Sequence, residues 1–357
     1  MNKPTPFYIK AFDGLRGIFV PPVLMTHLGC FDFLHDGSPW QHRLWMIVSG
    51  HTALYGFFCL SGFLITTILL KEKTQKGRVS IKNFLIRRAL RLFPPLVFFY
   101  TTIFILMQQQ ILVPNHVALL CSVFYCYNFI PNKFWSNELS HTWSLSVEEQ
   151  FYFLWPWVIQ FLHRNKIYIA TAVIALLSAI AIFVYPSIHF NMGGKMYFLT
   201  KAFNTSRWII PAIFPVLAGS CVALLYFYNR DWVIKFSDTK IIFALMFILL
   251  CCPMYLPLAL LEHSMLLQSF ALCILIIYVV THPSGKLATL LSFAPVVLIG
   301  KMSYAIYIWQ GLFLGTGPLN LHWFQQFPQN IILTMLVAAA SFFIIEKPLM
   351  RYKTKFG

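Results

Sequence analysis

Residues 12–29 read FDGLRGIFVPPVLMTHLG, an apolar segment that is long enough to enter a membrane as a helix and yet carries Arg16 and His27. Eleven residues, close to three helical turns, separate the two, so their side chains point the same way along roughly 16 Å of rise. Ionisable groups within lipid are costly and are functional candidates by default. The pattern also fits a simpler interpretation, in which Arg16 anchors the helix end and His27 is a hydrogen-bonded bundle residue.

The composition of the whole chain indicates a membrane protein. Of its 357 residues, 59% are hydrophobic and 11% are charged, which is more apolar side chain than a soluble domain needs. Eleven apolar runs lie near residues 15–34, 44–70, 92–112, 117–130, 147–162, 167–185, 208–228, 241–258, 264–281, 295–314 and 329–345. The run at 117–130 is short and bounded by Pro114 and Pro131, so we interpret it as a re-entrant or interfacial segment. The sequence therefore predicts an all-α, polytopic membrane protein with about ten transmembrane helices.

Basic residues are distributed unevenly over the two sides that ten crossings define. Of the 27 Lys and Arg residues, 22 fall on one side, and the other side keeps Arg43, Lys133, Lys195, Lys201 and Arg207. The positive-inside rule places the basic side, with both termini, in the cytoplasm. This orientation signal accounts for the net charge of +16, so we expect the lipid bilayer and no nucleic acid as a partner.

The eight cysteines form neither a CxxC motif nor a Cys/His spacing typical of metal sites, so no metal is expected. Most of them lie in apolar runs, where cysteine behaves as a small core residue. Cys121 and Cys126 could face an oxidising compartment, but we predict no disulfide. No stretch resembles a linker or a soluble module, so residues 1–357 are expected to form a single membrane domain with no fused soluble domain.

Arginines mark two further positions. A basic connection runs from Lys71 to Arg91, and within it Arg88 and Arg91 are three residues apart and share a helix face. Paired guanidinium groups suit phosphate, although the same cluster also suits a topology signal that contacts anionic lipid. Arg207 lies at an outer span end against the inside bias, either as a functional cation or as a headgroup contact.

Residues 141–157 read HTWSLSVEEQFYFLWPW and bring two carboxylates to the entrance of a span. Glu148 or Glu149 could orient an imidazolium or bind sugar hydroxyls, or one could simply stabilise the helix N-terminus. Adjacent residues do not share a helix face, so we expect at least one to have no functional role. Tyr304 and Tyr307 share a face near another span end, a pattern typical of an interfacial belt.

Taken together, these stretches resemble the membrane acyltransferase-3 family, the integral-membrane O-acyltransferases of surface glycans. The resemblance rests on FDGLRG with His27, FFCLSGFLI (57–65), RRALRLFPP (87–95), HTWSLSVEEQFYFLWP (141–156), NTSRW and LAGSCVALL (204–225), SYAIYIW (303–309) and IEKPL (345–349). It covers nearly the whole chain in the family's order, and the Arg-x10-His span and the WSLSVEEQFY block are specific. Relatives often end the SYxxYLW segment with histidine, whereas this chain has Gln310, which cannot act as an acid or base.

The resemblance implies transfer of an acyl group, usually acetyl, from cytoplasmic acyl-CoA to a hydroxyl of a surface saccharide such as a lipopolysaccharide O-antigen sugar. It assigns catalysis to His27 and Glu148, and acetyl-CoA binding to Arg16, Arg88 and Arg91. The saccharide acceptor, on the extracytoplasmic side, is expected to contact Asp13, His141, Trp143, Ser144, Glu149, Arg207 and Tyr304. The protein is accordingly expected to be a multi-pass protein of the cell inner (plasma) membrane.

On this hypothesis neutral His27 removes the proton of the sugar hydroxyl, and a covalent acyl-imidazole is a variant. Two interpretations without covalent chemistry stay open. A transporter or flippase of lipid-linked saccharide explains the spans and the polar outer loops, and a non-catalytic scaffold explains the spans. Neither explains an arginine cluster next to a buried Arg/His pair, so we prefer the enzyme.

The predicted orientation can be tested by chemical labelling. In a variant without the native cysteines, Lys76→Cys should not react with a membrane-impermeant maleimide in intact cells, because residues 71–91 are expected in the cytoplasm. The same cysteine should react after permeabilisation. Lys133→Cys, predicted outside, is the control and should react in intact cells. Reaction of position 76 before permeabilisation would contradict the orientation.

Overall fold

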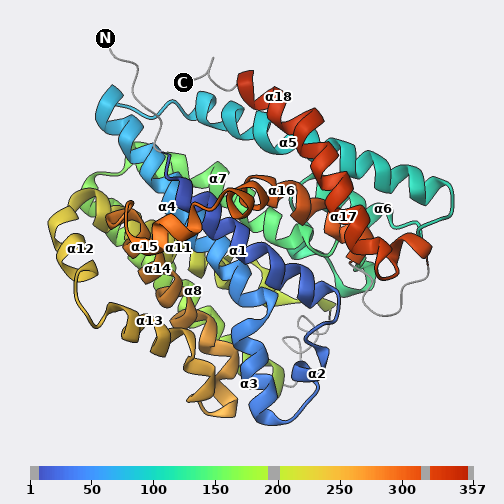
Figure 1. Cartoon of the computed structure of the whole chain (residues 1–357), viewed down its shortest axis with the longest axis horizontal. Helices are drawn as coiled ribbons and strands as arrows, with labels where there is room; N and C mark the ends of the chain where they lie inside the picture. The colour runs from blue at the N-terminus through green and yellow to red at the C-terminus, as the bar shows by residue number, and fades with distance from the viewer. Residues whose placement is uncertain (1–7, 192–201, 315–321, 353–357) are drawn as a thin grey trace. The chain divides into compact units, whose positions relative to one another are not determined.

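The computed structural model describes residues 8–191, 202–314 and 322–352 (Figure 1). Almost all of these residues are helical, and the extended pairing among them is an isolated bridge between Pro131 and Phe203. The all-α prediction is therefore confirmed for the described part of the chain. The expected cytoplasmic location of the two termini falls largely on residues outside it and stays a prediction.

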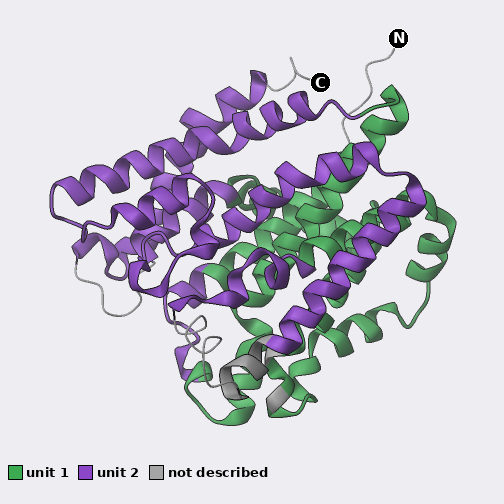
Figure 2. Ribbon diagram, turned by 180° about the vertical axis from the view of Figure 1, so that it is seen from behind, with its two compact units in different colours: residues 1–23, 34–78, 215–303 green, residues 24–33, 79–214, 304–357 purple. Residues whose placement is uncertain are grey.

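The chain forms two compact units, and each unit is assembled from several separate segments (Figure 2). Unit 1 comprises residues 1–23, 34–78 and 215–303, and unit 2 comprises residues 24–33, 79–214 and 304–357. Helix α1 (Lys10–His27) and helix α16 (Ala294–Leu314) each contribute one part to unit 1 and the other part to unit 2.

Unit 1 is organised around α14 (Ser264–Thr281), which packs against α4, α12 and α13. Its other helices are α3 (Pro39–Val48), α4 (Gly50–Lys76), α11 (Phe214–Tyr228, from Pro215 on), α12 (Arg230–Ser237), α13 (Ile242–Leu250) and α15 (Lys286–Leu291), with short 3₁₀ turns η4 (Cys252–Met254) and η5 (Leu258–His263). The outer arginine Arg43 is structural, because it donates a 2.6 Å hydrogen bond to the Pro253 carbonyl and so ties α3 to the turn after α13.

Unit 2 is organised around α5 (Ile81–Gln108), which packs against α6, α7, η8 and α18. Its other elements are α6 (His116–Val123), η1 (Tyr127–Phe129), η2 (Asn132–Phe134), α7 (Thr142–Phe161), α8 (Arg164–Asn191), η3 (Thr205–Arg207), α10 (Ile209–Ala212), η7 (Trp323–Gln325), α17 (Gln329–Ala340), the π-helical segment η8 (Ser341–Glu346) and α18 (Lys347–Met350). The short α2 (Asp32–His35) lies at a boundary between the units' segments. With eight residues, about 12 Å of rise, α6 is too short to cross a bilayer.

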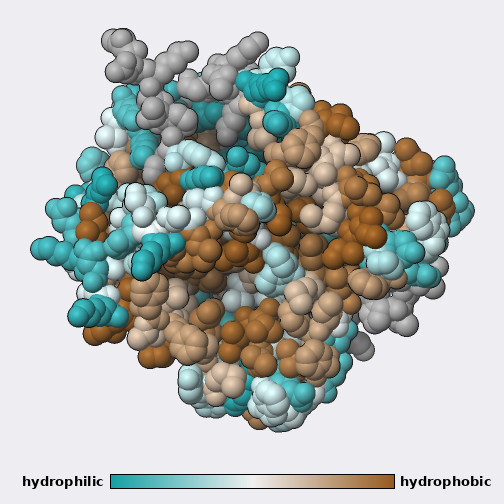
Figure 3. Space-filling view, in the orientation of Figure 1, coloured by the Kyte–Doolittle hydropathy of each residue, from teal (hydrophilic) through white to brown (hydrophobic). Residues whose placement is uncertain are grey.

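Six helical stretches in the described part of the chain are long and apolar enough to cross a membrane, so the molecule is a multi-pass membrane protein. They are 39–76, 81–108, 164–184, 264–281, 294–314 and 329–350. Apolar side chains cover much of the face seen in Figure 3, and α8 exposes Ile169, Val173 and Leu176, as expected of a helix that contacts lipid.

The expected count of about ten transmembrane helices remains a prediction, because several apolar runs do not form one long apolar helix. The run at 241–258 forms only the nine-residue α13 before Pro253 and Pro257, and prolines cannot donate the hydrogen bonds that would extend it. The run at 208–228 divides between α10 and α11 beside Pro211 and Pro215. Helices α1 and α7 carry charged and polar residues that lower their mean hydropathy.

Glycines allow the helices of unit 1 to approach to backbone contact. A Cβ on Gly300 would collide with the Asp13 carbonyl, and one on Gly62 would collide with the Val216 carbonyl. In a membrane, where helix association depends on close packing, small residues at such crossings are what bring helices together. Gly300 therefore fixes how α16 crosses α1 within this unit.

Gly300→Ala should destabilise unit 1, because the new methyl group forces two backbones apart. The expected cost is about 1–3 kcal/mol, measured as a lower unfolding temperature of the detergent-purified protein. Gly285→Ala is the control, because its Cβ would meet only atoms of His282 at 3.3 Å. Equal unfolding temperatures for the two variants would show that the Gly300 contact is not constraining.

Candidate active site

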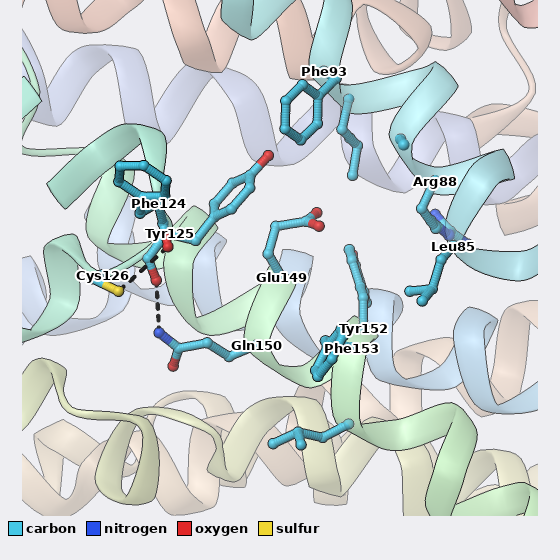
Figure 4. A pocket seen from close by; sticks show the side chains of 13 residues that line it. Leu85, Arg88, Phe93, Phe124, Tyr125, Cys126, Glu149, Gln150, Tyr152 and Phe153 are labelled. Carbon is cyan, nitrogen blue, oxygen red and sulfur yellow. Dashed lines mark hydrogen bonds between the residues drawn. The ribbon is translucent and has the colours of Figure 1, made fainter. Parts of the chain in front are cut away.

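A pocket in unit 2 collects charged residues that the sequence had singled out (Figure 4). Its volume is about 470 Å³, and its walls are residues 85–93 of α5, residues 124–126 after α6, and residues 149–154 of α7. Most of the lining is apolar or aromatic, whereas Arg88 and Glu149 bring opposite charges into it. A pocket of this size with a few convergent polar groups is typical of small-molecule sites.

Aromatic rings and a carboxylate hold the Arg88 guanidinium. Its central carbon lies 5.2 Å from the ring centre of Tyr152 and 5.5 Å from that of Phe84. Glu149 interacts electrostatically with Arg88, and also with Glu148 beside it. Arg88 is thus held between side chains of α5 and α7 and does not extend freely into solvent.

Tyr125 contributes a strained backbone to the pocket wall. Its φ of 53° lies in the left-handed region, which is rare for an aromatic residue. The Gln150 amide holds this conformation by donating 2.8 Å to the Tyr125 carbonyl and 3.0 Å to the Asn128 side chain. Strain that neighbouring groups stabilise in this way is often found at functional sites.

A second polar centre of unit 2 surrounds His141, which precedes α7. The Tyr307 hydroxyl donates 3.1 Å to the His141 carbonyl, and the Ser144 hydroxyl donates 3.0 Å to the same oxygen. The two hydroxyl oxygens lie 2.5 Å apart, so one hydroxyl can donate to the other in place of its bond to the carbonyl. The imidazole packs against the Phe99 and Tyr307 rings, and a Cβ on Gly311 would collide with it.

The His141 imidazole is buried and chemically unsatisfied. Only 3% of the residue is exposed, and neither ring nitrogen has a hydrogen-bond partner among the described residues. Burial, with a smaller contribution from His27, lowers the pKa of His141 to about 3, so the ring is neutral at pH 7. Buried polar atoms are almost always hydrogen-bonded. These two nitrogens therefore indicate a place where a ligand or a water molecule binds.

The structure brings most of the predicted site residues into unit 2. His27, at the end of α1, interacts electrostatically with His141, and Glu148 interacts with Tyr307. Arg207 lies over Trp135 and Trp143, 4.0 and 5.7 Å from the ring centres. The Tyr304 hydroxyl donates to the Leu92 carbonyl of α5 at 2.9 Å, so this tyrosine is a helix contact as well as a candidate ligand.

Two predicted residues belong to unit 1. Asp13 and Arg16, three residues apart on α1, form an ion pair with 2.9 Å between Nη1 and Oδ1. The pair lies near the start of α1, and its carboxylate partly satisfies the Arg16 charge. The structure therefore agrees with a structural role for Asp13 in holding Arg16.

Four residues of this site were not predicted from the sequence. Tyr125 and Gln150 shape the pocket, Tyr307 binds the His141 carbonyl, and Glu346 is 3% exposed on a π-helical segment that packs against α5. Arg91 is the charged group that acts on Glu346. The IEKPL motif contained a signal for Glu346, whereas the strain at Tyr125 depends on tertiary contacts that no local pattern reveals.

Gln310, where relatives often have histidine, is also buried. It is 1% exposed, and both polar atoms of its amide lack a hydrogen-bond partner among the described residues. An amide can donate and accept hydrogen bonds but cannot titrate. Any contribution of this position to chemistry is therefore limited to binding.

Comparisons with known proteins agree on one family. The family model described as an acyltransferase domain (Acyl_transf_3) matches residues 9–346. O-acetyltransferase OatA of Staphylococcus aureus (strain NCTC 8325 / PS 47) is 28% identical over 97% of this chain and 58% of its own length. The putative peptidoglycan O-acetyltransferase YrhL of Bacillus subtilis (strain 168) is 30% identical over 96% of this chain and 55% of its own length. The chain thus spans less than two thirds of these relatives, and no solved structure matches it.

Ser144→Ala and Tyr307→Phe test whether the hydroxyl pair stabilises the His141 turn. Each should lower the free energy of unfolding by about 1 kcal/mol, and the double variant should cost less than the sum, because both remove one shared network. The measurement is chemical unfolding of purified protein. Tyr304→Phe with Ser144→Ala is the control pair and should be additive. Additivity of Ser144 with Tyr307 would show that the network does not exist in solution.

Proposed function

This chain belongs to the acyltransferase-3 family, and we propose that it transfers an acetyl group from acetyl-CoA to a hydroxyl of a saccharide outside the membrane. The observation that carries the proposal is the His141 centre, where buried, unpartnered imidazole nitrogens lie within electrostatic reach of His27. An imidazole that is neutral at pH 7 has a ring nitrogen available to accept a proton, and a hydroxyl needs such a base to attack a thioester.

In the proposed reaction His27 is the general base. It takes the proton of the sugar hydroxyl while the hydroxyl oxygen attacks the thioester carbonyl carbon. The carbon–sulfur bond then breaks, and the CoA thiolate leaves and receives the proton, so the products are the acetyl ester and CoA. Glu148, which interacts electrostatically with Tyr307 of α16, stabilises the imidazolium that forms between these steps.

His141 and Ser144 are proposed to bind the acceptor. The free ring nitrogens of His141 supply one donor and one acceptor for sugar hydroxyls. Trp143 and Arg207 form a stacked pair beside this centre, and aromatic faces of this kind present an apolar surface with a polar edge.

The donor is proposed to bind through arginine. Within unit 2 its phosphates would pair with Arg91, with Arg88 on the same helix, because guanidinium groups make charge-assisted, bidentate bonds to phosphate. A role of Arg16, in unit 1, in binding acetyl-CoA stays a prediction from the resemblance. The protein would act in the inner (plasma) membrane, with acetyl-CoA on the cytoplasmic side. A thioester is an activated acyl group, so no metal is needed for the transfer.

Among acceptors, a peptidoglycan sugar is favoured by the name of the Bacillus relative. The lipopolysaccharide O-antigen sugar implied by the resemblance has no support from the relatives' names. The acceptors can be compared directly in one assay, because each would carry the labelled acetyl ester on a different polymer.

His27→Ala should reduce acetyl transfer at least about 10²-fold, because loss of a general base removes that contribution to the rate. The measurement is label passing from radioactive acetyl-CoA to peptidoglycan fragments in vesicles that contain the purified protein. His116→Ala, an exposed histidine of α6, is the control and should leave the rate unchanged. Full activity of His27→Ala would refute the role of His27. Movement of a saccharide without label transfer would favour a transporter.

A further inference from the structure

The pocket beside Glu149 is chemically different from the His141 centre and has no role in the steps above. Two polar side chains, Arg88 and Glu149, line an otherwise mostly apolar pocket. A purely apolar chain would make no hydrogen bond to either of them. A neutral amide matches both, because its carbonyl accepts from a guanidinium and its N–H donates to a carboxyl oxygen.

The dimensions of the pocket select a slender ligand. It follows α5 from Leu85 to Phe93, eight residues that rise about 12 Å. In Figure 4, Arg88 and Cys126 lie on opposite sides of Glu149. Glu149 is therefore found between a guanidinium on one side of the pocket and a thiol on the other. The ligand is therefore elongated, with amide groups along it.

We propose that this pocket binds the pantetheine arm of the acyl-CoA donor, with Arg88 and Glu149 recognising an amide and Tyr125 closing the far end. The inference rests on the proposed acetyl-CoA-dependent function. It separates the tasks of the two arginines: Arg88 binds the arm, and Arg91 remains for the phosphates. Arg91 interacts electrostatically with the buried carboxyl group of Glu346 on η8, which packs against α5.

The position of the pocket suits delivery of the thioester to the His141 centre. Glu149 lines the pocket, whereas Glu148, the preceding residue, interacts with Tyr307, which binds the His141 carbonyl. On α5, Tyr100 lies near Tyr125 of the pocket, and the preceding Phe99 packs on the His141 ring. Adjacent residues of two helices thus connect the pocket to the reaction centre.

A lipid chain is the rival occupant, because the rim is apolar. Phe93, Phe124 and Phe153 are 50%, 71% and 56% exposed, as expected of side chains that face the bilayer. A lipid chain would use these rings but not the charges of Arg88 and Glu149. The two occupants are distinguished by which compound protects the pocket from chemical labelling.

The test uses Cys126, a pocket thiol, and bromoacetyl-CoA, which alkylates a thiol with loss of bromide. The full chain in detergent should be alkylated at Cys126, as located by peptide mass spectrometry. Burial raises the pKa of nearby Cys121, which lowers its reactivity. Acetyl-CoA and acetyl-pantetheine, which lacks the nucleotide, should each slow the alkylation at least about tenfold, and Cys126→Ser should abolish the labelled peptide.

Two variants separate binding of the pantetheine arm from binding of the nucleotide phosphates. Ala89→Phe fills the pocket and should raise KM for both donors at least about tenfold, whereas Arg91→Ala should raise it for acetyl-CoA alone, because acetyl-pantetheine has no nucleotide phosphates. Equal effects of the two variants on both donors would overturn the assignment.

The failure of this inference differs from a failure of the proposed function. If the protein transfers acetyl groups while Cys126 is not alkylated, or is protected by phospholipid vesicles and not by the donors, the pocket does not bind the arm. If neither transfer nor donor protection is found, the acetyl-CoA-dependent function itself is wrong.

Discussion

The two adjacent glutamates of α7 determine how this molecule separates its polar sites. Neighbouring residues on a helix point about 100° apart, so Glu148 and Glu149 must serve different surroundings. Glu149 lines a mostly apolar pocket together with Arg88, and Glu148 lies within electrostatic range of Tyr307 beside His141. A carboxyl group within a membrane bundle is costly without polar neighbours, so Arg88 and Tyr307 lie where these two side chains need them.

This arrangement explains why the surrounding helices are irregular. Strain at Tyr125, a π-helical segment ending in Glu346 and a glycine at position 311 all occur where a polar group must be reached. A regular helix would present a side chain or an intact backbone hydrogen bond at each of these points. Local irregularities of this kind are common at functional sites, because they aim groups that a regular helix cannot.

Much of the fold followed from the sequence, since apolar runs of sufficient length predict membrane helices. The helical class and the multi-pass character were predicted in this way. Helix continuity was less predictable, because Pro253 and Pro257 end an apolar run early, whereas Pro94 and Pro95 are accommodated within α5. Motifs identified His141, Glu149 and Arg88, but not Tyr125 or Gln150. Their roles depend on a contact across 25 residues of sequence, which no periodicity encodes.

The central claim is that a donor on one side of the membrane meets a saccharide on the other at a buried imidazole. It is tested most directly in sealed vesicles that contain the protein, with radioactive acetyl-CoA supplied only to the side bearing residues 71–91 and the saccharide only to the opposite side. The account predicts labelled saccharide on the opposite side while the vesicles exclude free acetyl-CoA. Label appearing only when donor and saccharide share one side would contradict it.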